Sequence, residues 1–169
     1  MNGIAWVRIL VGAVWLNGAI EKFLNPDFPR QFAASLGAGG YISQALSWFQ
    51  DLMRTYVVPN AETFAQLQRL GELALGLALV LGLLINLAAI GSVILSLAIL
   101  ISQGGVRLGT GLGSPEFLTI DLLIALLSLV ILLSPASKAL SLDAAVARRR
   151  PRLAPLLLNR RPGRHRSRI

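Results

Sequence analysis

The chain has 169 residues, 54% of them apolar, and a positive mean hydropathy, which is typical of integral membrane proteins. It has no cysteine, and its single histidine, His165, lies near the carboxyl end, so thiolate metal sites, iron–sulfur clusters and haem ligation within the apolar part are excluded. The net charge of +8 is concentrated at the carboxyl end, because residues 138 to 169 contain ten basic side chains and one acidic one.

The first apolar segment covers residues 4 to 24, enough to cross a bilayer whose hydrocarbon core takes about 20 helical residues. A cleaved signal peptide has its positive charges before the apolar run, whereas here Arg8 lies inside the run and Glu21 and Lys22 lie in its last part. We therefore predict a retained first membrane helix, which ends at Pro26.

Residues 30 to 63 are too polar to span a membrane, but their middle part has the periodicity of an amphipathic helix. Apolar and aromatic residues recur there at helical spacing: Ile42, Ala45, Leu46, Phe49, Leu52, Met53 and Tyr56. Polar residues occupy the opposite face, so residues 41 to 57 are predicted to form a helix that lies in the membrane interface. We expect Pro59 to end this helix and Asn60 to cap the next one.

Residues 73 to 101 contain no charged side chain, and this run is too long for one membrane crossing and too short for two. Residues 64 to 102 together are long enough for a hairpin of two helices. The predicted helices cover residues 64 to 84 and 87 to 102, with a tight turn at residues 82 to 86. The first of these helices then carries Arg69 and Glu72 roughly 7–12 Å below the membrane surface.

A glycine-rich stretch over residues 103 to 115 is predicted to form a loop or lid, and a fourth apolar segment follows at residues 117 to 133. Four crossings place both termini on the same side of the membrane. The arginine-rich tail, residues 144 to 169, assigns that side to the cytoplasm, because basic residues are retained there. Residues 1 to 143 are thus predicted to form an all-α integral membrane four-helix bundle, with an additional amphipathic interfacial helix in the first outer loop.

The tail contains two arginine clusters with leucines between them. We expect it to lie on anionic lipid, since each basic residue near the surface gains about 1 kcal/mol there. Docking of a partner protein is the alternative. Nucleic-acid binding is not expected, because no aromatic residue is interleaved with the arginines.

The first helix carries a spaced motif. Its members are Arg8, Gly12, Trp15, Gly18 and Lys22, in the pattern Arg-x3-Gly-x2-aromatic-x2-Gly-x3-Lys. This motif resembles the opening of the DoxX/DoxD-like membrane family, as do Glu72 ahead of a glycine-punctuated apolar run and the Ser-Leu-Asp at residues 141 to 143. The resemblance covers residues 4 to 143. It implies a four-helix protein in the cytoplasmic membrane of a prokaryote, and some members of the family are subunits of thiosulfate:quinone oxidoreductase.

Five ionisable residues are predicted to lie in the outer third of the membrane: Glu21, Lys22, Arg69, Glu72 and Asp121. A charged side chain at the bilayer centre costs on the order of 3 kcal/mol, so each of them needs a partner or a function. We expect Lys22, Arg69, Glu72 and Asp121 to converge on one site. In one interpretation they form salt bridges that lock three helices, and in the other they line a small polar pocket. The two interpretations can coexist.

In a polar pocket these residues would bind the carbonyl oxygens of a quinone, or hold a small oxyanion at Lys22 and Arg69. Glu72 and Asp121 are the candidate catalytic residues, because either carboxylate can transfer protons. Glu21 is a further candidate for ligand binding. Arg8 lies about 21 Å from Lys22 along the helix, at the inner boundary, where it is either a snorkelling anchor or a packing partner within the bundle.

The leading functional hypothesis is a membrane subunit of an oxidoreductase system that associates with quinone through these charged residues. No metal or covalent cofactor is expected, so the quinone or the cofactor of a partner would carry electrons. We expect a protein partner or a second copy of the chain within the lipid bilayer. The main alternative is a non-enzymatic anchor or assembly subunit that docks a partner. A small-solute permease has less support, because four helices leave little room for a gated path.

The topology can be tested with single cysteines, because the chain has none. Residues 25 to 63 and 103 to 116 should face the outside. A membrane-impermeant thiol reagent added outside should therefore label Ser43→Cys and leave Ser167→Cys unlabelled. Labelling of Ser43→Cys from the cytoplasmic side alone would contradict the predicted orientation.

Overall fold

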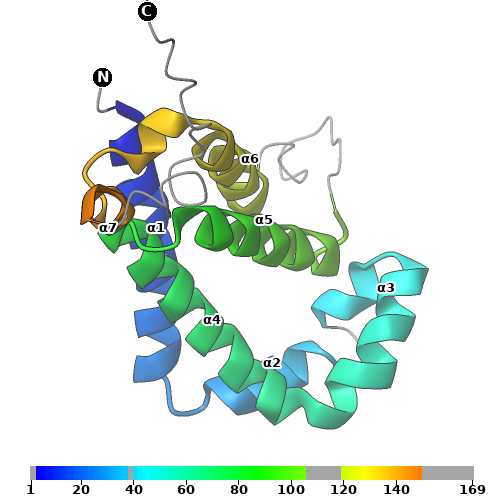
Figure 1. The fold of residues 1–169 in the computed structure, drawn as a ribbon. Helices are drawn as coiled ribbons and strands as arrows, with labels where there is room; N and C mark the ends of the chain where they lie inside the picture. Colours follow the sequence, from blue (N-terminus) through cyan, green and yellow to red (C-terminus); the bar gives the residue numbers. More distant parts are fainter. Residues whose placement is uncertain (1–2, 38–39, 106–118, 150–169) are drawn as a thin grey trace, which may run out of the picture.

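The computed structural model describes residues 3 to 37, 40 to 105 and 119 to 149, and the regular structure within these ranges is entirely helical. The bundle consists of α1 (Gly3–Leu24), α4 (Ala61–Leu81), α5 (Ile85–Ser102) and α6 (Ile120–Leu133) (Figure 1). α1 packs along α4, and α5 packs along α6. The all-α membrane bundle predicted from the sequence is confirmed.

By length and composition, α1, α5 and the helical run Ser47–Leu81 are able to cross a membrane. α6 is shorter, because its 14 residues extend about 21 Å, less than the hydrocarbon thickness of about 30 Å. It begins after Thr119, whose hydroxyl accepts a hydrogen bond of 3.3 Å from the Leu122 N–H. The first two residues of the predicted fourth crossing and most of the predicted glycine loop lie outside the described residues.

The turn between α4 and α5 lies where the sequence predicted it. Gly82 follows α4 with a φ of 69°, and Leu84 precedes α5 with a φ of 49°. Glycine in the left-handed region is a common helix end, because it adopts this conformation without strain. Glycine is also needed here for space, since a β-carbon on Gly82 would overlap Arg8 and Ser141.

A buried polar cluster closes this end of the bundle. We call it the turn cluster, and it comprises Arg8, Lys138, Asp143 and the turn itself. The Asp143 carboxylate accepts hydrogen bonds of 2.9 Å from the backbone N–H groups of both Leu84 and Ile85. It therefore caps the first turn of α5, a role usually filled by a residue next to the helix in sequence.

Arg8 is fully buried in the turn cluster, with none of its surface exposed. Its guanidinium donates hydrogen bonds to the carbonyl oxygens of Leu79 (2.8 Å) and Leu140 (3.0 Å). Of the two interpretations of Arg8, the packing partner within the bundle is correct. The snorkelling anchor is wrong, because a snorkelling guanidinium would lie at the surface.

Lys138 is the second buried cation of the turn cluster, and its ammonium donates to the Asn86 carboxamide oxygen over 2.5 Å. Burial lowers the pKa of Lys138 from 10.5 to about 8, although the Asp143 carboxylate opposes this effect and the Arg8 charge adds to it. Between these two values the unfolded chain binds the proton more tightly than the folded one. The contribution of Lys138 to the free energy of unfolding therefore rises with pH in this window.

Two glycines allow α1 and α4 to pack closely. A β-carbon on Gly12 would lie 2.8 Å from the Val80 backbone nitrogen, and one on Gly76 would lie 2.8 Å from the Leu16 backbone nitrogen. A larger residue at either position would force the two helices apart. Membrane helices commonly use such small residues to approach each other, because lipid offers no hydrophobic drive for their association.

α2 (Phe28–Ser35) is a helix that the sequence analysis did not predict. Its second residue is Pro29, which fits the first turn of a helix because the N–H group that proline lacks has no helical partner there. α2 packs against α4. The prolines after α1 therefore end one helix and help to start the next.

The predicted interfacial helix over residues 41 to 57 is present in pieces. They are a 3-10 turn (Tyr41–Gln44), α3 (Ser47–Leu52) and a π-helical turn (Met53–Val57). Extended backbone at Ala45 separates the first piece from α3. The predicted apolar face is partly buried, since Ile42 and Phe49 are covered while Tyr56 is exposed.

The prediction that Pro59 ends this helix is wrong. A 3-10 turn (Val58–Asn60) continues the π-helical turn directly into α4. Pro59 lies at the start of that turn, where its missing N–H is not required. Asn60 does not cap α4 with its side chain either, because its amide donates to the Tyr56 carbonyl oxygen over 3.1 Å.

The predicted boundary between the bundle and the tail at residue 143 is too early. α7 (Leu142–Arg149) runs across it, and Ala147 is buried. Arg148 and Arg149 are exposed at the end of α7. The rest of the predicted tail, residues 150 to 169, lies outside the described residues.

Asp143→Asn should destabilise the protein by about 1–3 kcal/mol, because an amide can accept only one of the two capping hydrogen bonds well and no longer balances Arg8 and Lys138. Thermal unfolding of the purified protein in detergent measures this. Asp27→Asn is the matched control, since the Asp27 side chain is 62% exposed, and it should change the free energy of unfolding by less than about 0.5 kcal/mol. Equal stability of the two variants would contradict the capping role.

Candidate functional site

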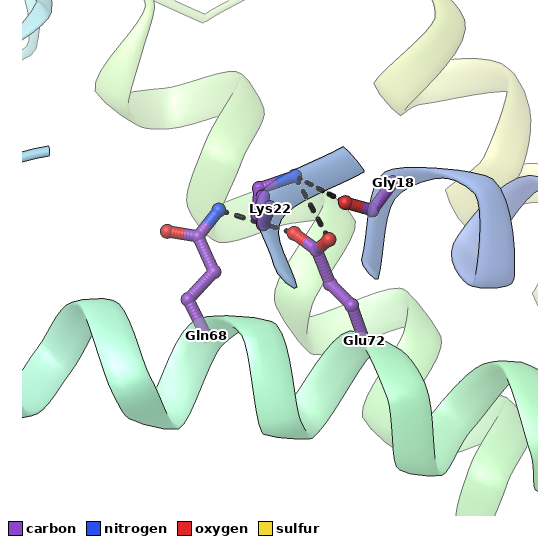
Figure 2. A network of polar contacts seen from close by, with 4 residues as sticks. All are labelled: Gly18, Lys22, Gln68 and Glu72. Atoms are coloured by element: carbon purple, nitrogen blue, oxygen red, sulfur yellow. Dashed lines mark hydrogen bonds and ion pairs between the residues drawn. The ribbon is translucent and has the colours of Figure 1, made fainter. Parts of the chain in front are cut away.

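An ion pair with a buried carboxylate joins α1 to α4 in the other half of the bundle (Figure 2). Lys22 Nζ lies 2.8 Å from Glu72 Oε2, and it also donates to the Gly18 carbonyl oxygen over 3.3 Å. The second carboxylate oxygen, Glu72 Oε1, accepts a hydrogen bond of 3.1 Å from the Gln68 amide. We call these four residues the Glu72 network. Glu72 itself is 2% exposed, so its charge depends on these partners.

The sequence produces the Glu72 network through helical spacing. Gln68 precedes Glu72 by four residues on α4, and Gly18 precedes Lys22 by four residues on α1, so each pair shares a helix face. A β-carbon on Gly18 would lie 3.0 Å from Glu72 Oε2. Glycine at this position therefore leaves the space that the ion pair occupies.

Arg69 does not join the Glu72 network. Its guanidinium lies over the Phe23 ring, with its central carbon 4.8 Å from the ring centroid, which is a cation–π contact. Within the part of the chain that the structure describes, Arg69 Nε is buried without a hydrogen-bond partner. Of the salt bridges expected among Lys22, Arg69, Glu72 and Asp121, the described part of the chain forms the one between Lys22 and Glu72.

Asp121 lies at the start of α6 and accepts a hydrogen bond of 3.5 Å from the Gln103 amide. Among the described residues, no hydrogen bond or ion pair joins the Asp121 carboxylate to Glu72. Glu21 is exposed on the surface of α1. Of the predicted site residues, the structure thus brings Lys22 and Glu72 into contact, whereas Arg69 and Asp121 contact Phe23 and Gln103 instead.

Sequence reasoning missed Gln68 and Gln103, the two neutral amides that bind the acidic residues. An uncharged amide in an apolar helix costs less to bury than a charged group, so its position indicates a site less clearly. The position of Gln68 four residues before Glu72 was the available signal.

A second polar group lies in the middle of the bundle. The Trp15 indole N–H donates to Ser92 Oγ over 2.7 Å, and Ser92 Oγ lies 2.7 Å from Ser128 Oγ. These side chains come from α1, α5 and α6 and are all buried. Ser96, one turn further along α5, is fully buried and its hydroxyl has no partner among the described residues.

The motif of α1 now has a physical explanation. Arg8 donates to the carbonyl oxygens of Leu79 and Leu140. Gly12 allows the close approach of α4, and Trp15 donates to Ser92. Gly18 gives space to the ion pair, and Lys22 forms it. One helix face therefore carries the polar contacts that tie α1 to the rest of the bundle.

Comparison with protein families finds a match over residues 4–155 to the model described as "TQO small subunit DoxD". The chain belongs to the DoxD family. Its match extends from the start of α1 to beyond α7, so it includes both the Glu72 network and the turn cluster. No curated protein and no solved structure matches this DoxD chain.

The site of this DoxD chain offers a carboxylate, an ammonium group and amides. In the described ranges, His and acidic side chains do not gather in a group of three or more that could hold a metal ion. Groups of the kinds present can hydrogen-bond a polar ligand and exchange protons with it.

The ion pair between Lys22 and Glu72 should affect the free energy of unfolding. Lys22→Met should destabilise the protein by about 2–3 kcal/mol, because it leaves the Glu72 carboxylate buried without its cation. This loss is smaller than for a fully buried pair, since the Lys22 side chain is 22% exposed. Lys22→Met with Glu72→Met should recover most of this loss, since no charge then remains buried.

Arg30→Met is the matched control for these variants. It breaks a surface pair with Asp27, in which the side chains are 90% and 62% exposed, and should change the free energy of unfolding by less than about 0.5 kcal/mol. Thermal or denaturant unfolding in detergent compares the four proteins. A double variant that is less stable than Lys22→Met would show that the pair does more than neutralise a buried charge.

Proposed function

We propose that this DoxD-family protein is a membrane subunit of a quinone-linked oxidoreductase, and that the quinone head group binds at the Glu72 network. The abbreviation TQO in the family description stands for thiosulfate:quinone oxidoreductase, which supports a quinone-linked role. The observation that carries the proposal is the buried Glu72 carboxylate, held by one ammonium group and one neutral amide within an apolar bundle.

The residues of the Glu72 network fit a quinone head group. The Gln68 amide has two N–H donors and gives one to Glu72, so the other can bind a carbonyl oxygen. The Gln68 amide oxygen and the Glu72 carboxylate can accept hydrogen bonds from the hydroxyl groups of the reduced form. A bound quinone supplies two-electron redox chemistry coupled to protons, and Glu72 is placed to hold or release a proton beside it.

Asp121 and Lys22 extend this role of Glu72. Lys22 balances the charge of the Glu72 carboxylate across the 2.8 Å contact between Nζ and Oε2. Asp121, in the first turn of α6, is a candidate for passing protons toward the membrane surface. The chain has no cysteine, and we propose that a partner protein delivers the electrons.

We also propose that the protein lies in the cytoplasmic membrane of a prokaryote with both termini in the cytoplasm. The contacts of Arg8 near the start of α1 with the segment before α7 support a common side for the two ends. The exposed Arg148 and Arg149 lead into the arginine-rich tail at this end. Basic residues favour the cytoplasmic side and bind anionic lipid there.

Glu72→Gln tests the head-group site, because it keeps the shape of the side chain and removes its charge and proton transfer. We expect its dissociation constant for ubiquinone and menaquinone analogues to rise by about tenfold or more, a loss of about 1.4 kcal/mol. Quinone titration of the purified protein in nanodiscs measures this. Glu62→Gln, at an exposed position of the same helix, is the matched control and should bind like the wild type.

Two outcomes would count against the proposed site. If Glu72→Gln is stable and binds quinone as well as Glu62→Gln does, the head group binds elsewhere. If the wild-type protein binds neither quinone, the quinone-linked role is contradicted and the non-enzymatic anchor becomes the better hypothesis.

A further inference from the structure

α4 and α5 diverge from the turn, and Figure 1 shows the angle between them. An apolar groove of about 590 Å³ lies between the two helices. Its walls include Gly71, Ala74 and Ala78 on α4 and Gly91 and Ala98 on α5. Along α5 the groove extends from residue 84 to residue 98, about 21 Å at 1.5 Å per residue.

The groove has an end, a floor and an open part. The groove ends at the turn, where Leu84 lines it and the Asp143 carboxylate fixes the start of α5. Leu75 crosses the floor, since a β-carbon on Gly91 would lie 2.8 Å from Leu75 Cδ2. At Gly71 the groove is open, because a β-carbon there would meet no atom within 4 Å.

The open part of the groove adjoins the Glu72 network. Gln68, Gly71 and Leu75 follow each other at spacings of three and four residues, so they share one face of α4. Gly71 and Leu75 line the groove, and Gln68 binds Glu72. One turn of helix thus separates the apolar groove from the proposed head-group site.

The charges at this end indicate which apolar chain the groove fits. A phospholipid would bring a phosphate close to the Glu72 carboxylate, which would repel it. Of the nearby cations, Lys22 already forms an ion pair and the Arg69 guanidinium lies over the Phe23 ring. A neutral head group with carbonyl oxygens meets no such repulsion and finds the Gln68 amide as a donor. The combination of an apolar groove with a carboxylate and an amide at its open part favours a neutral lipid-soluble molecule.

We propose that the groove between α4 and α5 binds the isoprenoid tail of the quinone, with the head group at the Glu72 network and the tail directed toward the turn. This inference rests on the proposed function. It adds that affinity depends on tail length, because each further isoprene unit buries more apolar surface along the groove.

The test compares a one-isoprene and a four-isoprene ubiquinone on the purified full-length protein in nanodiscs. Ala74→Leu with Ile94→Trp fills the groove at two of its lining residues, both of which are exposed, so folding should be retained. Affinity for the long-tailed quinone should fall by about tenfold, while affinity for the short-tailed quinone should change by less than about threefold.

The matched control introduces the same new side chains, leucine and tryptophan, on the exposed surface of α1. Ala13→Leu with Leu10→Trp should leave both affinities unchanged. A four-isoprene ubiquinone with a photoreactive tail provides a second measurement on the wild type. Its crosslinks, mapped by mass spectrometry, should lie on the groove-lining residues of α4 and α5.

The outcomes separate this inference from the proposed function. If neither ubiquinone binds the wild type, the proposed function fails and the inference with it. If both bind but the groove-filling variant keeps the full preference for the longer tail, only the groove inference fails. Native mass spectrometry that finds a phospholipid lost from the groove-filling variant, with quinone affinity unchanged, would likewise assign the groove to lipid.

Discussion

A charge in an apolar environment must be neutralised or hydrogen-bonded, and this constraint organises both ends of the bundle. Near the turn, Arg8 and Asp143 are almost completely buried and bind backbone groups that the turn leaves without helical partners. In the other half, Glu72 is buried and depends on Lys22 and Gln68. The first set of contacts fixes the backbone, whereas the second joins side chains of two helices.

The fold followed from the sequence where apolar length and a single helix breaker decided it. The 29 uncharged residues from 73 to 101 forced a hairpin, and Gly82 marked its turn. The outer segment was harder, because local signals compete there. Pro59 is normally a helix breaker, yet a π-helical turn followed by a 3-10 turn carries the chain through it. Such irregular turns have no distinctive sequence pattern.

The candidate site was predictable in part for a related reason. The cost of burial identified Lys22 and Glu72 as residues that need partners, and they pair with each other. It did not identify the geometry around them. The cost of burying a charge applied equally to Arg69, but its guanidinium contacts the Phe23 ring instead of a carboxylate. Depth along a helix follows from residue number, whereas the direction of a side chain depends on the neighbours of that face.

The capping of α5 by Asp143 has a consequence for biosynthesis. The Leu84 N–H and its acceptor are 59 residues apart, so the helical hairpin is synthesised well before the carboxylate that completes it. At about 5–20 residues per second, this interval lasts roughly 3–12 s. During that time the start of α5 has to be hydrated or held by the insertion machinery. The final docking of Asp143 is therefore a late step of maturation. A chain that stops before residue 143 lacks this cap and leaves the first N–H groups of α5 without their acceptor.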